Sequence, residues 1–260
     1  MRPAAQDAES VKLLGQAGSS SEDGKYFVDP ESLEQTPLAP HMGKTETMLR
    51  WGFIKKVYGI ICAQLLLTSL SACVILFNAP VRAFVTSNVA FQITFCILPL
   101  VGLIPLYIYQ RKHPYNLVIL AAWTLSISVS VGSACTLYEP YIVLEALLLT
   151  ATIVVGLTAY TFQAARRGQN FSHMGPLLFV GLCSLVMWSF IQLLFPVGPA
   201  SRTVFALLGA IIFSGYIVFD TDQLIQRYDL DQYIWASVNL YLDIINLFIK
   251  LLQLLGDRRN

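Results

Sequence analysis

Residues 219–243 read FDTDQLIQRYDLDQYIWASVNLYLD, and a nearly continuous apolar run lies on each side of this stretch. Asp220 ends the first run, and Asp243 lies well inside the second, which continues as INLFIKLLQLL at 245–255. An ionised acid in the middle of a membrane-spanning helix costs about 2.5–3.5 kcal/mol, so it normally faces a cavity or a partner. The stretch therefore predicts two membrane helices, joined by a short polar loop, whose carboxylates avoid lipid.

The composition of the whole chain agrees with a membrane protein. Hydrophobic residues make up 55% of the 260 residues and charged residues 13%, with a mean hydropathy of +0.60. A soluble domain typically has about 25% charged residues. There is no basic patch with interleaved aromatic residues, so we expect no nucleic-acid partner. The five cysteines lie in apolar stretches, without a CxxC motif or a nearby histidine, and predict neither a metal site nor a cofactor.

Seven apolar segments, each long enough to cross a bilayer as a helix, follow one another after residue 50. Their expected ranges are 57–77, 89–109, 116–136, 141–162, 174–195, 203–225 and 235–255. Open sheet edges are not tolerated in hydrocarbon, which argues against strands there. The predicted fold class is therefore an all-α integral membrane protein, a bundle of seven helices over residues 49–260. Residues 1–48 are rich in Ser, Pro, Gly and Glu, and predict a disordered cytosolic tail.

The short loops predict the orientation of the bundle, because lysine and arginine accumulate in cytosolic loops. Eight of these residues lie on the side of the N-terminal tail and four on the opposite side. The first group is Arg50, Lys55, Lys56, Arg111, Lys112, Arg166, Arg167 and Arg227, and the second is Arg82, Arg202, Arg258 and Arg259. This excess places the N-terminus in the cytosol.

The seventh segment has two possible paths. It either crosses the membrane fully or is re-entrant, in which case Arg258 and Arg259 return to the cytosol. The segment also contains polar residues, namely Asn239, Asp243, Asn246 and Lys250. A helix this polar needs protein rather than lipid around it, so we expect it at the centre of the bundle.

Asp220 and Asp243 form the candidate site. At a rise of 1.5 Å per residue they lie about 7 and 12 Å from the cytosolic ends of two antiparallel helices. Two acids in one site of low dielectric share a proton and titrate as a unit. When protonated they hydrogen-bond, and when deprotonated they repel each other and offer oxygens to a hard cation such as Ca²⁺, bound transiently. The alternative is a pair of solvated helix-end acids, neutralised by Arg227 or Lys250.

Two further acids are weaker candidates for a role at the mouths of the bundle. Glu145 lies about four residues into its span, and is either an interfacial residue or part of a lumenal entrance. Asp222, with Asp229 and Asp231, predicts a solvated loop that keeps the cytosolic mouth negative. An EF-hand is excluded for these three acids, because no Gly or acid falls at the required later loop positions.

Several stretches of the chain carry a resemblance to a known family. The most specific is GYIVFDTDQLIQRYDLDQYIWASVNLYLDIINLFIKLLQLL at 215–255. Shorter ones are RKHPYNL (111–117), VLEALLLTA (143–151), GLTAYTFQAARRGQNFSHMGPLLF (156–179) and WSFIQLLFP (188–196). These stretches resemble the transmembrane Bax inhibitor motif-containing family, and most of all the plant members of its Lifeguard branch. The resemblance covers nearly everything after residue 50.

This resemblance implies a seven-helix fold with a central seventh helix, in an endomembrane. The endoplasmic reticulum or Golgi is the main expectation, with vacuole or plasma membrane as alternatives. It also implies suppression of programmed cell death and a pH-sensitive calcium leak, with the paired aspartates of the family falling on Asp220 in VFDTD and Asp243 in YLDIINLF. A bacterial relative latches an arginine onto one aspartate, and the nearest candidate here is Arg111. The lysine-rich C-terminal tail of the founding animal member is replaced by GDRRN, so mechanisms that need it are in doubt.

Two other functions stay open. In the first, the protein regulates cell death by contact with other regulatory proteins, and the two acids only hold the bundle together. The second is an intramembrane aspartyl protease, which also needs two aspartates that share a proton. However, residues 217–219 are Ile-Val-Phe in place of the Gly-x-Gly of such proteases, and no Pro-Ala-Leu follows. We therefore expect no enzyme, and predict a calcium leak channel whose partners are the lipid bilayer and the transported calcium ion.

Overall fold

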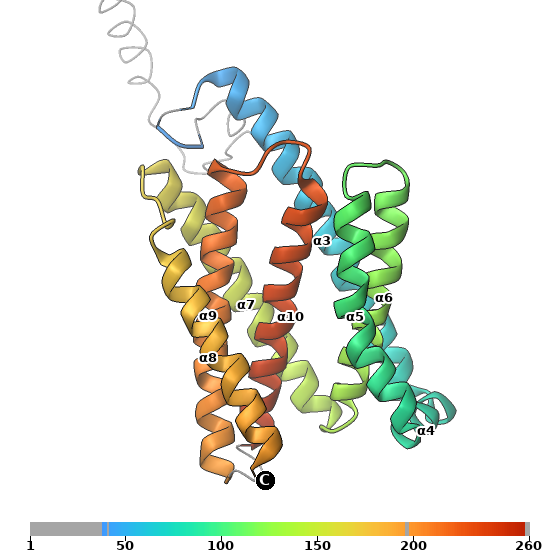
Figure 1. The fold of residues 1–260 in the computed structure, drawn as a ribbon. Helices are drawn as coiled ribbons and strands as arrows, with labels where there is room; N and C mark the ends of the chain where they lie inside the picture. Colours follow the sequence, from blue (N-terminus) through green and yellow to red (C-terminus); the bar gives the residue numbers. More distant parts are fainter. Residues whose placement is uncertain (1–37, 41, 196–197, 258–260) are drawn as a thin grey trace, which may run out of the picture. The chain divides into compact units, whose positions relative to one another are not determined.

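The structure, a computed structural model, describes residues 38–40, 42–195 and 198–257, which all belong to one compact unit. Within these residues the chain forms eight helices and no strand (Figure 1). The helices are α3 (Lys44–Phe77), α4 (Ala79–Ser87), α5 (Val89–Tyr109), α6 (Tyr115–Cys135), α7 (Pro140–Arg166), α8 (Met174–Leu194), α9 (Pro199–Gln226) and α10 (Tyr233–Asp257). All except α4 are long and apolar enough to cross a membrane. The predicted seven-helix membrane bundle is confirmed.

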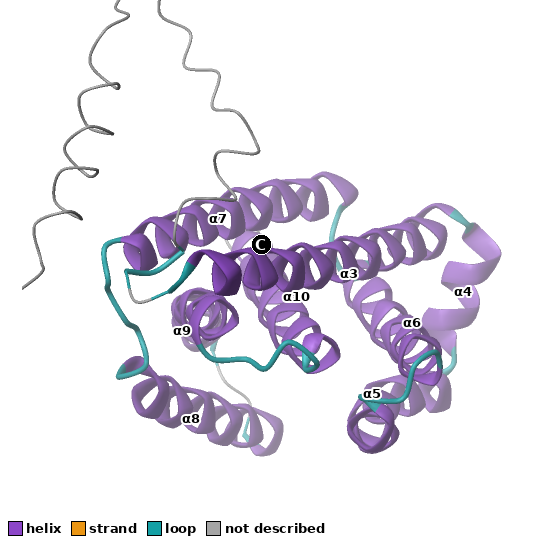
Figure 2. Cartoon of the chain, turned by 90° about the horizontal axis from the view of Figure 1, so that it is seen from above, coloured by secondary structure: helices purple, strands orange, loops and turns teal. Residues whose placement is uncertain are grey.

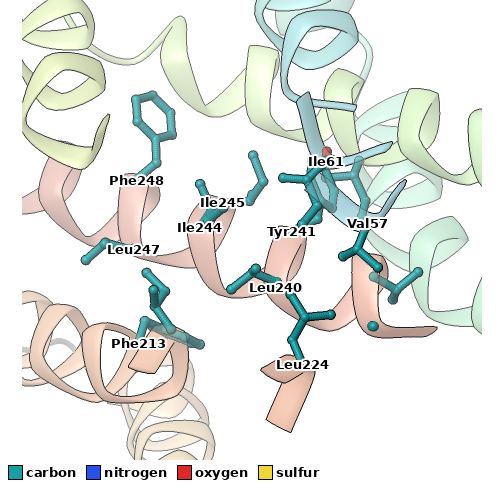
Figure 3. Packing of buried hydrophobic residues seen from close by; sticks show 14 of the residues in the cluster. Val57, Ile61, Phe213, Leu224, Leu240, Tyr241, Ile244, Ile245, Leu247 and Phe248 are labelled. Atoms are coloured by element: carbon teal, nitrogen blue, oxygen red, sulfur yellow. The ribbon is translucent and has the colours of Figure 1, made fainter. Parts of the chain in front are cut away.

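Helix α10 is the centre of this bundle, as expected. It packs against α3, α6, α7 and α9, whereas α8 packs against α9 alone among the well-packed helix pairs (Figure 2). Leu240 and Tyr241 of α10 are almost fully buried, Tyr241 beside Val57 and Ile61 of α3 and Leu240 on the side of α9. Figure 3 shows this packing around α10 at close range. The peripheral place of α8 leaves a space between α8, α9 and α10 that holds the candidate site.

The path of α10 answers the question of a re-entrant seventh segment. The helix is unbroken over 25 residues, which corresponds to a length of about 37 Å. The hydrocarbon core of a bilayer is about 30 Å thick. Figure 1 shows the end of α10 at the same end of the bundle as the start of α9, opposite the start of α3. The structure therefore favours the complete crossing.

The beginning of the first span differs from the prediction. Helix α3 starts at Lys44 rather than at residue 57, so the residues from Lys44 to Met48, which we assigned to the disordered tail, are helical. Within these residues Thr47 is buried, and Phe53 and Ile54 are buried one to two turns further on. Residues 1–37, where most of the predicted tail falls, lie outside the described residues. The residues at the start of α3 are mostly polar, so a search for long apolar segments could not find the beginning of this helix.

A short helix that we did not predict, α4, follows the first span. Its nine residues are too few to span a membrane. An asparagine precedes each of α4 and α5, and each side chain accepts a hydrogen bond from the first turn of its helix: Asn78 from the Val81 N–H at 3.3 Å and Asn88 from the Phe91 N–H at 3.1 Å. Asparagine is a favoured residue at this position because it satisfies an otherwise unpaired N–H.

Polar side chains inside the bundle bind one another and join three spans. Thr68 of α3 lies 2.8 Å from the hydroxyl of Tyr241 in α10, and the Ser128 hydroxyl of α6 donates to Thr68 at 3.0 Å. Gln64 donates to Thr124 at 3.0 Å between α3 and α6. Buried polar groups are costly unless they are hydrogen-bonded. These contacts therefore fix the rotation of α3 and α6 about α10, and so keep the remaining faces of α10 for α9 and the cavity.

Candidate functional site

A cavity of about 560 Å³ lies between α8, α9 and α10. Its wall is apolar on the side of α8 and polar on the side of α10. The lining residues are Leu182, Leu185, Val186 and Ser189 of α8, Phe205, Phe213, Tyr216, Phe219 and Asp220 of α9, and Asn239, Leu242, Asp243, Asn246 and Lys250 of α10. The cavity is thus a largely apolar space with a few polar groups, the usual character of a binding site or a conduction path.

The helical period explains why α10 presents its polar residues to this cavity. Asn239, Asp243, Asn246 and Lys250 are separated by four, three and four residues. Residues at these intervals lie on one face of a helix. The opposite faces of α10 bury its leucine, isoleucine and tyrosine residues against the neighbouring spans. The polar residues that suggested a central helix therefore form one stripe, which is directed at the cavity.

Asp220 and Asp243 come together at the end of the cavity nearer to the α9–α10 loop. Both carboxyl groups line the cavity, and they lie close enough to interact directly. The side chain of Asp243 is only 7% exposed, and within the described residues its Oδ2 atom has no hydrogen-bond partner. The antiparallel packing of α9 and α10 thus brings the two predicted acids to one point, and leaves a carboxylate oxygen available to a proton, a water molecule or a cation.

Beside the loop end of the cavity lie contacts that we did not predict. Asn239, in the cavity wall, donates a hydrogen bond of 2.8 Å to the hydroxyl of Tyr228 in the α9–α10 loop. Burial raises the pKa of the Tyr228 phenol, and the nearby Asp220 carboxylate raises it further. The Arg50 side chain of α3 donates a hydrogen bond to the Tyr228 carbonyl. Arg50 and Tyr228 are 178 residues apart, so no local sequence pattern could have paired them.

Arg111 does not contact the aspartate pair. Its Nε atom lies 3.3 Å from Oδ2 of Asp231, and both side chains are well exposed. The latch that the resemblance offered for Arg111 is therefore not present in this structure. The alternative partner of the pair, Lys250, has its ammonium group 3.9 Å from the centre of the Phe205 ring and 3.3 Å from Oε1 of Gln253. Neither contact neutralises Asp220 or Asp243.

The expectation for Asp222 is wrong, because this residue is neither in a loop nor solvated. It lies in α9 with its side chain fully buried. Its carboxylate accepts a hydrogen bond of 3.1 Å from the Phe171 N–H and another from the Gln226 side chain. Two residues after Asp220, it faces a different side of the helix and does not line the cavity. Asp222 ties the α7–α8 loop to α9, which is a structural task.

Glu145 is also separate from the cavity. It lies in the second turn of α7, its side chain is exposed, and it does not belong to the cavity wall. This position agrees with an acid near one surface of the membrane, and leaves Asp220 and Asp243 as the acids that line the cavity.

The fold and the site together define a class: a multi-pass helical membrane protein with a cavity that contains paired carboxylates. The comparisons with known proteins make the class specific. The family described as inhibitor of apoptosis-promoting Bax1 matches residues 50–260. The chain belongs to this Bax inhibitor family.

Its relatives include plant and viral proteins. The BI1-like protein of Arabidopsis thaliana is 48% identical over 252 residues, which are 96% of this chain and 97% of that protein. Protein LIFEGUARD 2 of the same plant is 46% identical over 85% of this chain and 93% of its own length. The Golgi anti-apoptotic protein of Vaccinia virus (strain Lister) is 38% identical over 80% of this chain and 86% of its own length. The resemblance to the Lifeguard branch is confirmed.

Proposed function

We propose that this protein suppresses programmed cell death by conducting calcium ions out of an endomembrane compartment, with Asp220 and Asp243 as a proton-sensitive gate. The names of its relatives support the cell-death part of this proposal: one is an anti-apoptotic protein of the Golgi, and the family as a whole is described as inhibiting the apoptosis-promoting Bax1. The Golgi relative also supports an endomembrane as the site of action, and we place this protein in the Golgi or the endoplasmic reticulum.

One observation carries the ion-conducting part: two carboxyl groups meet in a cavity between membrane-spanning helices. Calcium prefers oxygen ligands, and carboxylates are the strongest of these in proteins. An acid inside a membrane span is a functional feature by default, because its burial is costly. The names of the relatives refer to cell death and not to conduction. The second candidate is therefore a regulator that acts by contact with cell-death proteins.

The proposed gate responds to pH with a definite sign. At low pH the two acids hold one or two protons and hydrogen-bond to each other across α9 and α10. As pH rises, the shared proton is lost and two negative charges remain in a site of low dielectric, where they repel each other strongly. The repulsion separates the helices, and the free oxygens attract Ca²⁺. Flux therefore increases with pH.

The test is calcium flux into proteoliposomes that contain the purified full chain, measured from about pH 5 to pH 8. We compare the wild type with Asp243→Asn, which keeps the shape of the side chain and removes its charge. Glu145→Gln is the matched control, because it neutralises an acid outside the cavity. We expect the wild type and the control to conduct more as pH rises, and Asp243→Asn to lose this dependence. Absence of flux above empty liposomes, from protein shown to be folded, would leave the contact regulator as the better explanation.

A further inference from the structure

Besides the two aspartates, the cavity is lined by one lysine, Lys250, which lies closer than Asp243 to the C-terminal end of α10. Asp243 and Lys250 are seven residues apart on the same helix face, a separation of about 10 Å along the helix axis. The carboxylates occupy the end of the cavity near the α9–α10 loop, and the ammonium occupies the end near the start of α9, beside Phe205. The cavity is therefore negative at one end and positive at the other.

The position of Lys250 is built into the packing of α9 against α10. A Cβ atom at Gly209 of α9 would lie 2.8 Å from Cδ and 2.9 Å from Cγ of Lys250. Contacts this short do not occur, so any larger residue would displace the lysine stem from its place against the α9 backbone. The ammonium group then rests 3.9 Å from the centre of the Phe205 ring, in cation–π geometry, and 3.3 Å from Gln253. The side chain is thereby held along the cavity wall.

No acid balances this charge. Within residues 38–40, 42–195 and 198–257, the ammonium of Lys250 has a neutral amide and an aromatic ring as its partners, and no carboxylate forms an ion pair with it. A lysine in a membrane span is costly, and a methionine of similar length would pack at Gly209 without that cost. The charge itself is therefore the property that distinguishes this residue.

We propose that Lys250 is the electrostatic barrier of the cavity, a cation that repels calcium and limits both its passage and its occupancy at the aspartate pair. This inference rests on the proposed function, and it names the residue that sets how leaky the path is. An ion that moves between the far end of the cavity and Asp243 passes along the wall that Lys250 lines. A unit charge about 10 Å from Ca²⁺ changes affinity on the order of fourfold, even with the dielectric constant of water.

The experiment compares Lys250→Met, which removes the charge at similar length, with Lys250→Arg, which keeps the charge. Two properties of the purified full chain are measured at low salt and pH 7: calcium flux in proteoliposomes, and the Kd for Ca²⁺ in detergent by isothermal titration. We expect Lys250→Met to raise the flux and lower the Kd, each on the order of fourfold. Lys250→Arg should stay near the wild type, and the combination of Lys250→Met with Asp243→Asn should lose the gain in affinity.

The two proposals fail in different ways. A wild type that conducts calcium, with Lys250→Met unchanged in both flux and Kd, overturns the barrier and leaves the aspartate gate intact. An equal effect of Lys250→Arg and Lys250→Met also overturns it, because packing rather than charge would then be responsible. A wild type without flux contradicts the proposed function and with it the effect on passage, while a lower Kd in Lys250→Met still supports the effect of Lys250 on calcium occupancy at the aspartate pair. Absence of calcium binding in both proteins overturns the barrier.

Discussion

Asn239 donates a hydrogen bond of 2.8 Å to the hydroxyl of Tyr228, and this bond joins the wall of the cavity to the α9–α10 loop. The phenol lies near both aspartates, and it is itself an acid that could take part in the pH response. Burial raises the pKa of Tyr228, with a further increase from the negative charge of Asp220. A tyrosine whose pKa lies above the ordinary value of about 10 is protonated at every pH well below that value. The phenol is therefore neutral between pH 5 and 8.

Tyr228→Phe should consequently leave the pH dependence of calcium flux unchanged. The substitution removes the acceptor of the Asn239 hydrogen bond, so the free energy of unfolding should fall by about 1 kcal/mol. Flux at each pH and thermal unfolding in detergent check the two parts of this prediction. A shift in the midpoint of the pH profile would show that Tyr228 titrates with the aspartates, in contradiction to the proposed gate.

Arg50 should be much more important for stability than Arg111. The Arg50 side chain is half-buried and donates a hydrogen bond to the carbonyl of Tyr228. This bond joins the N-terminal part of α3 to the α9–α10 loop. Loss of a hydrogen bond to a charged group costs about 1.5–3 kcal/mol, so we expect Arg50→Gln to lower the unfolding free energy by about this amount. Arg111→Gln removes an exposed ion pair with Asp231, which contributes about 0–1 kcal/mol. Thermal unfolding of both variants in one detergent gives the comparison, and equal losses would contradict the assigned role of Arg50.

Gly209 should resist replacement by alanine, whereas Gly156 should not. An added methyl group at Gly209 meets the stem of Lys250 at 2.8 Å, but at Gly156 of α7 it meets nothing within 4 Å. Overpacking costs about 1–3 kcal/mol, and alanine in an open helical position gains up to about 1 kcal/mol over glycine. We therefore expect Gly209→Ala to lower the melting temperature and Gly156→Ala to leave it equal or higher. A neutral Gly209→Ala would contradict tight packing of the lysine stem against α9.

The sequence was sufficient for the fold because the signals that determine it are regular. The spans carry long apolar runs, and the polar residues of the last span predict its place at the centre, which the packing of α10 confirms. The meeting point of Asp220 and Asp243 also followed from elementary geometry. Two helices joined by a short loop must be antiparallel, so residues at similar depth come together.

The sequence was insufficient where a contact depends on distant segments. In the sequence, Asp222 lies close to the polar loop that contains Asp229 and Asp231. In the structure it belongs to α9, and the Phe171 N–H of the α7–α8 loop donates a hydrogen bond to its buried carboxylate. The contact of Arg50 with Tyr228 joins the first span to the last loop. Hydropathy and loop charge contain no information on which helix faces meet. For the same reason the contribution of α8 to the cavity, and the approach of Lys250 to Gly209, became apparent only in three dimensions.

The orientation of the bundle in the membrane can be tested at Asn170. The loop between α7 and α8 contains Asn170-Phe171-Ser172, an N-x-S sequence that is an acceptor for N-glycosylation where it faces the lumen. The distribution of lysine and arginine places this loop in the cytosol, so Asn170 should carry no glycan. Seven crossings, which the seven long apolar helices favour, would place the C-terminus in the lumen, so a tag with an N-x-T sequence appended after Asn260 should be glycosylated. Expression in eukaryotic cells, followed by a mobility assay with and without endoglycosidase, measures both sites. A glycan on Asn170, with none on the tag, would show that the orientation is the reverse of the predicted one. The aspartate pair would then lie near the lumenal mouth, and lumenal rather than cytosolic pH would control the flux.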